Sequence, residues 1–203
     1  MESLIIIGTG GFAIELFGLL YGMQIKVLGF IGPEPQRNLP GKWLGEDDMI
    51  ENLPYRTKVL IAIGDPEVRS KLAHKINKNN LKQHTFIHPS AYVSPESIVA
   101  EGCIVYPNAT IHTSVVLDKN VLINSNVTVG HETTIAEFSS IGPGASIGGC
   151  CKIGKNFYIG IGASMLEKIT VCDHVVIGAG ATVISSIEFS GTYVGVPAKI
   201  IKK

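Results

Sequence analysis

The stretch INSNVTVGHETTIAEFSSIGPGASIGGCCKI, residues 123–153, places isoleucine or valine at every sixth position. The same spacing continues outward in both directions without one polar residue. The series is Ile87, Val93, Val99, Val105, Ile111, Leu117, Ile123, Val129, Ile135, Ile141, Ile147, Ile153, Ile159, Met165, Val171, Ile177, Val183 and Phe189. A period of six fits neither an amphipathic helix nor a simple strand alternation. It predicts a triangular solenoid in which each flat side is one hexad.

A second inward position follows four residues after each large one, and it is mostly small or β-branched. Cys103 and Cys151 occupy this position, so packing accounts for both cysteines. Glycine often follows the large residue directly, where a sharp turn favours a residue without Cβ. These glycines are Gly130, Gly142, Gly148, Gly154, Gly160 and Gly178.

Residues 1–85 have a different pattern, in which apolar runs alternate with helical segments. The expected strands are Leu4–Ile7, Ile25–Ile31 and Val59–Ile63, and the expected helices are Ala13–Met23 and Glu67–Asn77. Unbroken runs of Leu, Ile and Val are typical of strands covered on both faces, so this part is predicted to be an α/β unit with a parallel sheet.

A glycine-rich turn joins the first expected strand to the first helix. The segment Gly8-Thr9-Gly10-Gly11-Phe12-Ala13 fits G-x-G-x-x-A, in which glycines let the backbone approach phosphates at a helix N-terminus. An NAD site would also need an acidic residue at the end of the second strand. Phe30-Ile31-Gly32-Pro33 supplies none, which argues against NAD.

Composition excludes several classes of protein. The chain has 203 residues, with 17 Lys+Arg against 17 Asp+Glu, so it lacks the positive field that a nucleic acid partner requires. No apolar run approaches the roughly 18–20 residues that span a bilayer, and Met1-Glu2-Ser3 lacks the basic start of a secretion signal. We therefore expect a cytoplasmic protein without membrane insertion, whose four cysteines are reduced thiols.

The order of motifs along the whole chain resembles the hexapeptide-repeat sugar acetyltransferases of bacteria. The motifs are the glycine-rich turn, the segment Ala62-Ile63-Gly64-Asp65, the junction Ile87-His88-Pro89-Ser90-Ala91, the hexads, and the ending Val194-Gly195-Val196-Pro197-Ala198-Lys199. This group includes nucleotide-aminosugar N-acetyltransferases of surface-glycan pathways and sialic acid O-acetyltransferases. The resemblance implies a Rossmann-like α/β domain over 1–85 that binds a nucleotide sugar, a left-handed parallel β-helix over 86–203, and a homotrimer.

The resemblance also assigns catalytic roles. Asn124-Ser-Asn-Val-Thr-Val-Gly-His-Glu132 matches the family's catalytic stretch, so His131 is the expected general base and Glu132 the acid that orients its ring. Three hexads form one coil of the family's helix, so residues 18 apart stack and Gly149 lies next to His131. The backbone N–H of Gly149 matches the family's donor to the acetyl carbonyl, and Asn124 is the candidate contact to the substrate amine.

Binding residues follow from the same match. The nucleotide sugar is expected at Gly8, Gly10, Gly11, Phe12 and Gly64, and acetyl-CoA at Ser140, Gly149, Ile161 and Ala179. The chain departs from the family at Phe12 and Ser140, where His is usual, and at Gly32-Pro33, where acids are frequent. The departures at Phe12 and Gly32-Pro33 leave the sugar and the nucleotide base open, and the departure at Ser140 implies a weaker or water-mediated contact to acetyl-CoA.

The expected activity is acetyl-CoA-dependent N-acetylation of a nucleotide-linked sugar of the 4-amino-4,6-dideoxy type. One alternative is O-acetylation of sialic acid or a related sugar, and another is a non-catalytic scaffold that binds sugar nucleotides. A zinc site of the hexapeptide-repeat carbonic anhydrase type would use His112 and His131, but Ala136 stands where its third imidazole belongs. No metal is expected.

Overall fold

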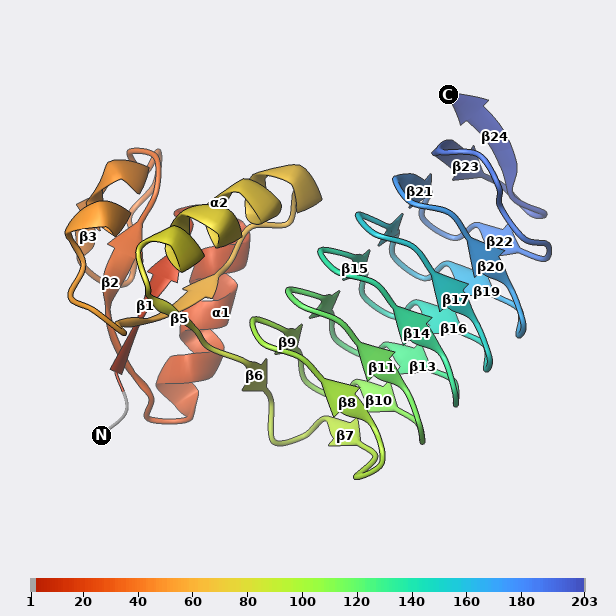
Figure 1. The fold of residues 1–203 in the computed structure, drawn as a ribbon, viewed down its shortest axis with the longest axis horizontal. Coiled ribbons are helices and arrows are strands. Elements are labelled where there is room, and N and C mark those ends of the chain that lie inside the picture. The colour runs from red at the N-terminus through yellow and green to blue at the C-terminus, as the bar shows by residue number, and fades with distance from the viewer. Residues whose placement is uncertain (1–2, 203) are drawn as a thin grey trace. The chain divides into compact units, whose positions relative to one another are not determined.

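The computed structural model describes residues 3–202, and it divides into two compact units. The first is Met1–Thr85 and the second is Phe86–Lys203 (Figure 1). No helix among the described residues is both long and apolar enough to cross a membrane.

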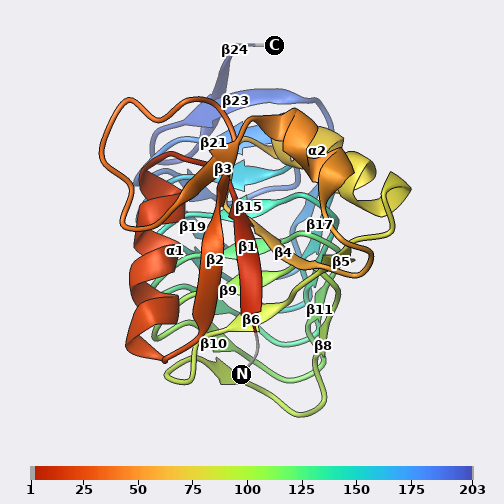
Figure 2. The same ribbon diagram turned by 90° about the vertical axis from the view of Figure 1, so that its left-hand side faces the viewer.

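The first unit is a parallel five-stranded sheet with helices packed against it. Strand order is β3-β2-β1-β4-β5, and α1 and α2 lie on opposite sides of the sheet (Figure 2). The elements are β1 (Ser3–Ile7), α1 (Gly11–Gly22), β2 (Lys26–Ile31), β3 (Trp43–Gly45), the 3-10 helix η1 (Asp47–Asn52), β4 (Lys58–Ile61), α2 (Pro66–Lys78) and β5 (Lys82–Gln83). The chain runs to one side of β1 first and then to the other, so the topological switch point lies between β1 and β4.

The three predicted strands and two helices of this unit are present. β1 is almost fully buried and α2 begins after Asp65, whose Oδ1 accepts the N–H groups of Glu67 and Val68. The sequence did not predict β3, η1 or β5. β3 and β5 have only three and two residues, which is too short for an apolar run to stand out.

The second unit is a three-sided solenoid of short strands that are parallel except for the last, which pairs antiparallel with the strand before it. One side holds β7 (Tyr92–Val93), β10 (Thr110–Ile111), β13 (Thr128–Val129), β16 (Ser146–Ile147), β19 (Ser164–Met165) and β22 (Thr182–Val183). The next holds β8 (Ile98–Val99), β11 (Val116–Leu117), β14 (Thr134–Ile135), β17 (Lys152–Ile153) and β20 (Thr170–Val171). The third holds β6 (Phe86–Ile87), β9 (Ile104–Val105), β12 (Leu122–Ile123), β15 (Ser140–Ile141), β18 (Tyr158–Ile159), β21 (Val175–Ile177), β23 (Gly191–Val194) and β24 (Lys199–Lys202).

Register confirms the predicted stacking over most of the solenoid. Thr128 pairs with Ser146 and Val129 with Ile147, each 18 residues along. The large residue of each hexad from Val105 to Val183 is buried, and so are the small inward residues from Cys103 to Ala163. The core is a continuous apolar column inside the prism.

The six-residue pattern fails at both ends of the series. Ile87 is 39% exposed and Phe189 is 67% exposed, although both were expected to point inward. At the C-terminal end the coil is two residues shorter, since Val171 bridges to Ile187 and Ile177 pairs with Tyr193. Ile187 therefore takes the inward place that the period gave to Phe189.

The corner glycines are explained by close approach of successive coils. A Cβ at Gly130 would lie 2.5 Å from the backbone nitrogen of Gly149, and one at Gly148 would lie 2.4 Å from that of Glu167. The left-handed backbone of the turn falls two residues later, at φ 58° for both Glu132 and Cys150. Glycine is thus selected by space and not by a positive φ at these positions.

Candidate active site

His131 and Gly149 lie on adjacent turns of one edge of the prism. His131 follows β13 and Gly149 follows β16, and these strands pair in register. The Cys150 N–H donates to the His131 carbonyl at 2.7 Å, which fixes the two turns against each other. A Cβ at Gly149 would lie 2.7 Å from His131 Nε2 and 2.9 Å from Cε1 and Cδ2, so the imidazole lies directly against the glycine.

The Gly149 N–H is available to a ligand. Among residues 3–202 no group accepts it, whereas the neighbouring Gly148 N–H donates to Met165. A free amide beside an imidazole supplies one hydrogen-bond donor and one proton acceptor at the same place. This is the pair that acyl transfer needs, with the donor facing the carbonyl oxygen on which charge develops.

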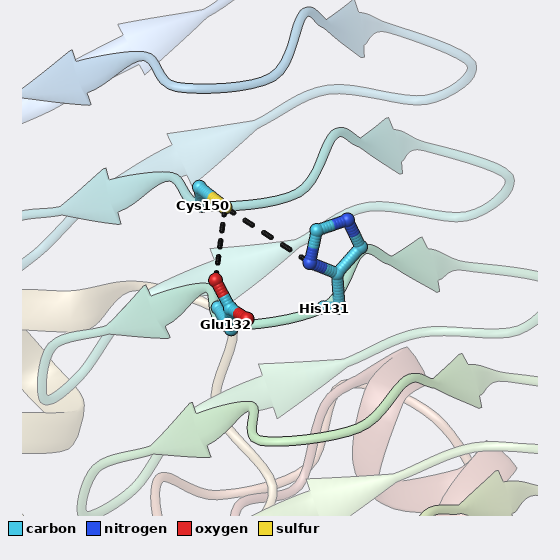
Figure 3. A group of neighbouring side chains, drawn as sticks. All are labelled: His131, Glu132 and Cys150. Carbon is cyan, nitrogen blue, oxygen red and sulfur yellow. Dashed lines mark hydrogen bonds between the residues drawn. The ribbon is translucent and has the colours of Figure 1, made fainter.

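Glu132 and Cys150 form a second stacked pair beside the first. The Cys150 thiol donates to Glu132 Oε2 at 3.2 Å, and its Sγ lies 3.9 Å from His131 Nδ1 (Figure 3). The hydrogen bond to the Glu132 carboxylate, followed by partial desolvation and the carboxylate's charge, raises the pKa of the Cys150 thiol. Lys168 opposes this rise. The thiol is therefore protonated and acts as a donor at neutral pH.

Cys150 was not predicted from the sequence, although the stacking of residues 18 apart identifies it. Adding 18 to His131 gives Gly149, and adding 18 to Glu132 gives Cys150. Side chains at stacked turn positions meet when both project from the prism, as these two do.

Thr133 is a further residue that holds the turn bearing Gly149. Its side chain is fully buried, and Oγ1 donates to the Gly148 carbonyl at 3.0 Å while accepting the Cys151 N–H at 3.1 Å. One hydroxyl thus joins both ends of the 148–151 turn. The sequence pattern identified Thr133 only as a small inward residue.

The structure does not bring the remaining solenoid candidates to His131 within one chain. Asn124, Ile161 and Ala179 follow β12, β18 and β21, strands of the third side, so they lie at a different edge of the prism. Asn124 Oδ1 accepts the N–H of Ser125. Ile161 and Ala179 are exposed, and no described residue accepts their N–H groups. Ser140 is a buried residue of β15.

The candidates of the first unit meet at the carboxyl ends of its central strands. Gly8, Gly10, Gly11 and Phe12 link β1 to α1, and Gly64 follows β4, which pairs with β1. Gly8 has φ 128° and a Cβ there would lie 2.7 Å from the Ala62 carbonyl oxygen. A Cβ at Gly10, Gly11 or Gly64 would meet nothing within 4 Å, so there is space for a ligand beside these three glycines.

Arg69 stabilises the loop that carries Gly64. The side chain is fully buried, and Nη1 donates to the Ile63 carbonyl at 2.8 Å and the Gly64 carbonyl at 2.9 Å. Crevices at a switch point are the usual ligand sites of open parallel sheets.

One group of potential metal ligands occurs among the described residues. It consists of His131, Glu132 and Cys150, whose donor atoms all lie within 4.8 Å of one another. His112 is not part of it, so the arrangement differs from the two-histidine pair weighed from the sequence.

The chain is similar to known proteins in its first unit and over its whole length. Residues 3–76 match the PglD N-terminal domain. The whole chain matches a histidine-to-asparagine mutant of perosamine N-acetyltransferase from Caulobacter crescentus in complex with CoA and GDP-perosamine, with a TM-score of 0.94, 26% identity, and coverage of 100% of this chain and 98% of that one. It also matches the acetyltransferase domain of PglB from Neisseria gonorrhoeae FA1090 in complex with acetyl coenzyme A, with a TM-score of 0.93, 28% identity, and coverage of 98% and 99%.

A shorter stretch matches a curated protein. Over 51 residues, 25% of this chain, it is 53% identical to a serine acetyltransferase from Buchnera aphidicola. The stretch spans 20% of that relative's length.

These findings confirm the fold class predicted from the sequence, a Rossmann-like α/β unit followed by a left-handed parallel β-helix. Over its whole length the chain is similar to acetyltransferases solved in complex with CoA or acetyl coenzyme A, the class of protein that its motifs resemble.

Proposed function

We propose that the protein transfers the acetyl group of acetyl-CoA to the amino group of a nucleotide-linked 4-amino-4,6-dideoxy sugar. The observation that carries the proposal is the imidazole of His131 lying against Gly149, whose N–H is free. The whole-chain similarity to an enzyme bound to CoA and GDP-perosamine supports this substrate class.

In this mechanism His131 Nε2 takes the proton of the attacking amine. Nε2 is the ring atom nearest to a Cβ built on Gly149, so the base lies next to the backbone whose N–H would hold the acetyl carbonyl. The amine nitrogen forms a bond to the thioester carbon, and the tetrahedral intermediate then expels the CoA thiolate. The Gly149 N–H stabilises the oxyanion, a contribution of about 3–4 kcal/mol where a single such donor has been removed. The family match assigns Glu132 to orienting the ring, and in this structure its carboxylate accepts the Cys150 thiol.

A homotrimer explains why the candidates occupy two edges of the prism. The edge with Ile161 and Ala179 offers free N–H groups to the amide-rich arm of CoA, but the base is on another edge. If each active site combines the His131 edge of one copy with the Ala179 edge of the next, a three-fold ring closes and completes three sites. The first unit supplies the nucleotide-sugar crevice with Gly8, Gly10, Gly11, Phe12 and Gly64.

The test compares wild type with His131→Ala on a panel of substrates. We expect the wild type to acetylate a nucleotide-linked 4-amino sugar, and the variant to lose roughly 10²–10⁴-fold in kcat, the range typical of general base catalysis. The His131 carbonyl still accepts the Cys150 N–H in the variant, so thermal stability and oligomeric state should persist. Near wild-type turnover by His131→Ala would overturn the mechanism.

Two rival functions predict other results on the same panel. If a free or activated sialic acid is acetylated and the amino-sugar nucleotide is not, the protein is an O-acetyltransferase. Binding of sugar nucleotide without binding of acetyl-CoA in calorimetry would identify a non-catalytic scaffold. We place the proposed reaction in the cytoplasm, in the synthesis of surface polysaccharides, where acetyl-CoA and nucleotide sugars meet.

A further inference from the structure

Three different ligand atoms converge on the exposed edge where His131 lies. They are the thiol sulfur of Cys150, Oε2 of Glu132 and Nδ1 of His131, with Sγ at 3.2 Å from the carboxylate and 3.9 Å from the ring (Figure 3). Four-coordinate zinc with bonds of 2.0–2.3 Å places neighbouring ligand atoms about 3.4–3.6 Å apart. The two separations from Sγ lie on either side of this range, and all three donor atoms lie within 4.8 Å of one another, so side-chain rotations would bring them onto one ion.

The chemistry of the three donors fits a thiophilic divalent cation. Thiolate, imidazole and carboxylate are the protein ligands of zinc, and three of them with one open position make the usual reactive site. Zn²⁺ displaces the proton of the Cys150 thiol, which passes to solvent as a zinc–sulfur bond forms. The two positive charges are then balanced by the Cys150 thiolate and the Glu132 carboxylate.

We propose that His131, Glu132 and Cys150 bind Zn²⁺ and that the bound ion inhibits the transferase. The ion is an inhibitor in this scheme and takes no part in acetyl transfer. The inhibitory half of the inference rests on the proposed function, whereas the binding half does not.

Inhibition follows from which ring nitrogen the metal takes. Nδ1 of His131 faces Cys150, and Nε2 faces Gly149. A neutral imidazole carries one proton, so zinc on Nδ1 leaves that proton on Nε2. The nitrogen that faces the acetyl site then has no lone pair to accept the proton of the amine. The ion also engages the carboxylate of Glu132.

Binding is tested with Co²⁺, a spectroscopic substitute for zinc. We expect reduced wild-type protein in chelator-free buffer to show a thiolate-to-cobalt charge-transfer absorption, and Cys150→Ser to lose it. Serine suits this turn because Ser114 occupies the equivalent place with φ 57°. Cys151→Ser is the matched control, since its thiol is buried and donates to the Leu166 carbonyl. Absence of the band in wild type, or its survival in Cys150→Ser, would overturn the binding site.

Inhibition is tested by titrating Zn²⁺ into the acetyl-transfer assay and comparing each variant with its own uninhibited rate. Loss of an outer-shell partner alone costs roughly 10- to 100-fold in metal affinity. We therefore expect Cys150→Ser to raise the inhibiting zinc concentration at least about tenfold, and Cys151→Ser to leave it at the wild-type value. EDTA should restore activity to the inhibited wild type.

The two measurements separate the inference from the proposed function. A protein without acetyltransferase activity would still show the cobalt band through Cys150, which would overturn the function and keep the metal site. Equal zinc inhibition of wild type and Cys150→Ser would overturn inhibition through this site.

Discussion

The imidazole of His131 lies against the backbone of Gly149, so closely that a methyl group on the glycine would fall 2.7 Å from Nε2. Gly149→Ala should therefore displace the ring while leaving the amide in place. The backbone φ of Gly149 is not in the left-handed region, so alanine adds no conformational strain there. We expect kcat to fall by about 10²-fold, as for displacements near 1 Å of a reacting group. Steady-state kinetics with an amino-sugar nucleotide measures it.

Gly18→Ala is the control for this substitution. Gly18 lies in α1, where an added Cβ meets nothing within 4 Å, and alanine favours a helix interior. This variant should keep wild-type kinetics and match or exceed wild-type stability. Equal activity of Gly149→Ala and Gly18→Ala would show that the ring does not act from its position over the glycine.

Thr133→Val keeps the volume of the side chain and removes its hydroxyl. The Gly148 carbonyl and the Cys151 N–H would then lose their partner in a buried place, at a cost of about 1–3 kcal/mol in the free energy of unfolding. Because the turn between them carries Gly149, we expect a lower kcat as well as a lower Tm.

Ser139→Ala separates these two effects. Ser139 makes the same pair of bonds at another turn, to the Gly154 carbonyl and from the Phe157 N–H. It should lose comparable stability and keep its kcat at temperatures well below unfolding. A parallel loss of kcat in both variants would assign the effect of Thr133 to general destabilisation.

The six-residue period predicted the solenoid because each inward side chain repeats a single steric demand. Once residues 18 apart were known to stack, the nearness of His131 and Gly149 followed from arithmetic. The pattern could not predict the two ends of the series. Among the described residues no further coil stacks on Ile87, and the coil that would accept Phe189 is shortened. The pattern also does not predict where side chains outside the prism point. The hydrogen bond between Cys150 and Glu132 was therefore found only in the structure.

The glycines of the first unit separate into structural and binding types. Gly8→Ala places a Cβ against the Ala62 carbonyl at a φ of 128°, so we expect a lower Tm and loss of nucleotide-sugar binding together. Gly10→Ala adds a methyl group to open space, so it should keep the Tm within a few degrees and weaken binding alone. Calorimetry and thermal melting measure the two. Unchanged affinity in Gly10→Ala would remove Gly10 from the binding site.

Subunit mixing tests whether two copies share each active site. His131→Ala removes the base from one edge, and Ala179→Trp fills the other edge beside its free N–H. Each variant alone should be nearly inactive. When the two are co-expressed and assemble at random, a site joins the intact His131 edge of one variant to the intact Ala179 edge of the other with a probability of about one quarter. We expect about a quarter of wild-type activity in the mixture. If both edges served the same site within one chain, the mixture would stay as inactive as its components, and the arrangement of the trimer proposed for this protein would be wrong.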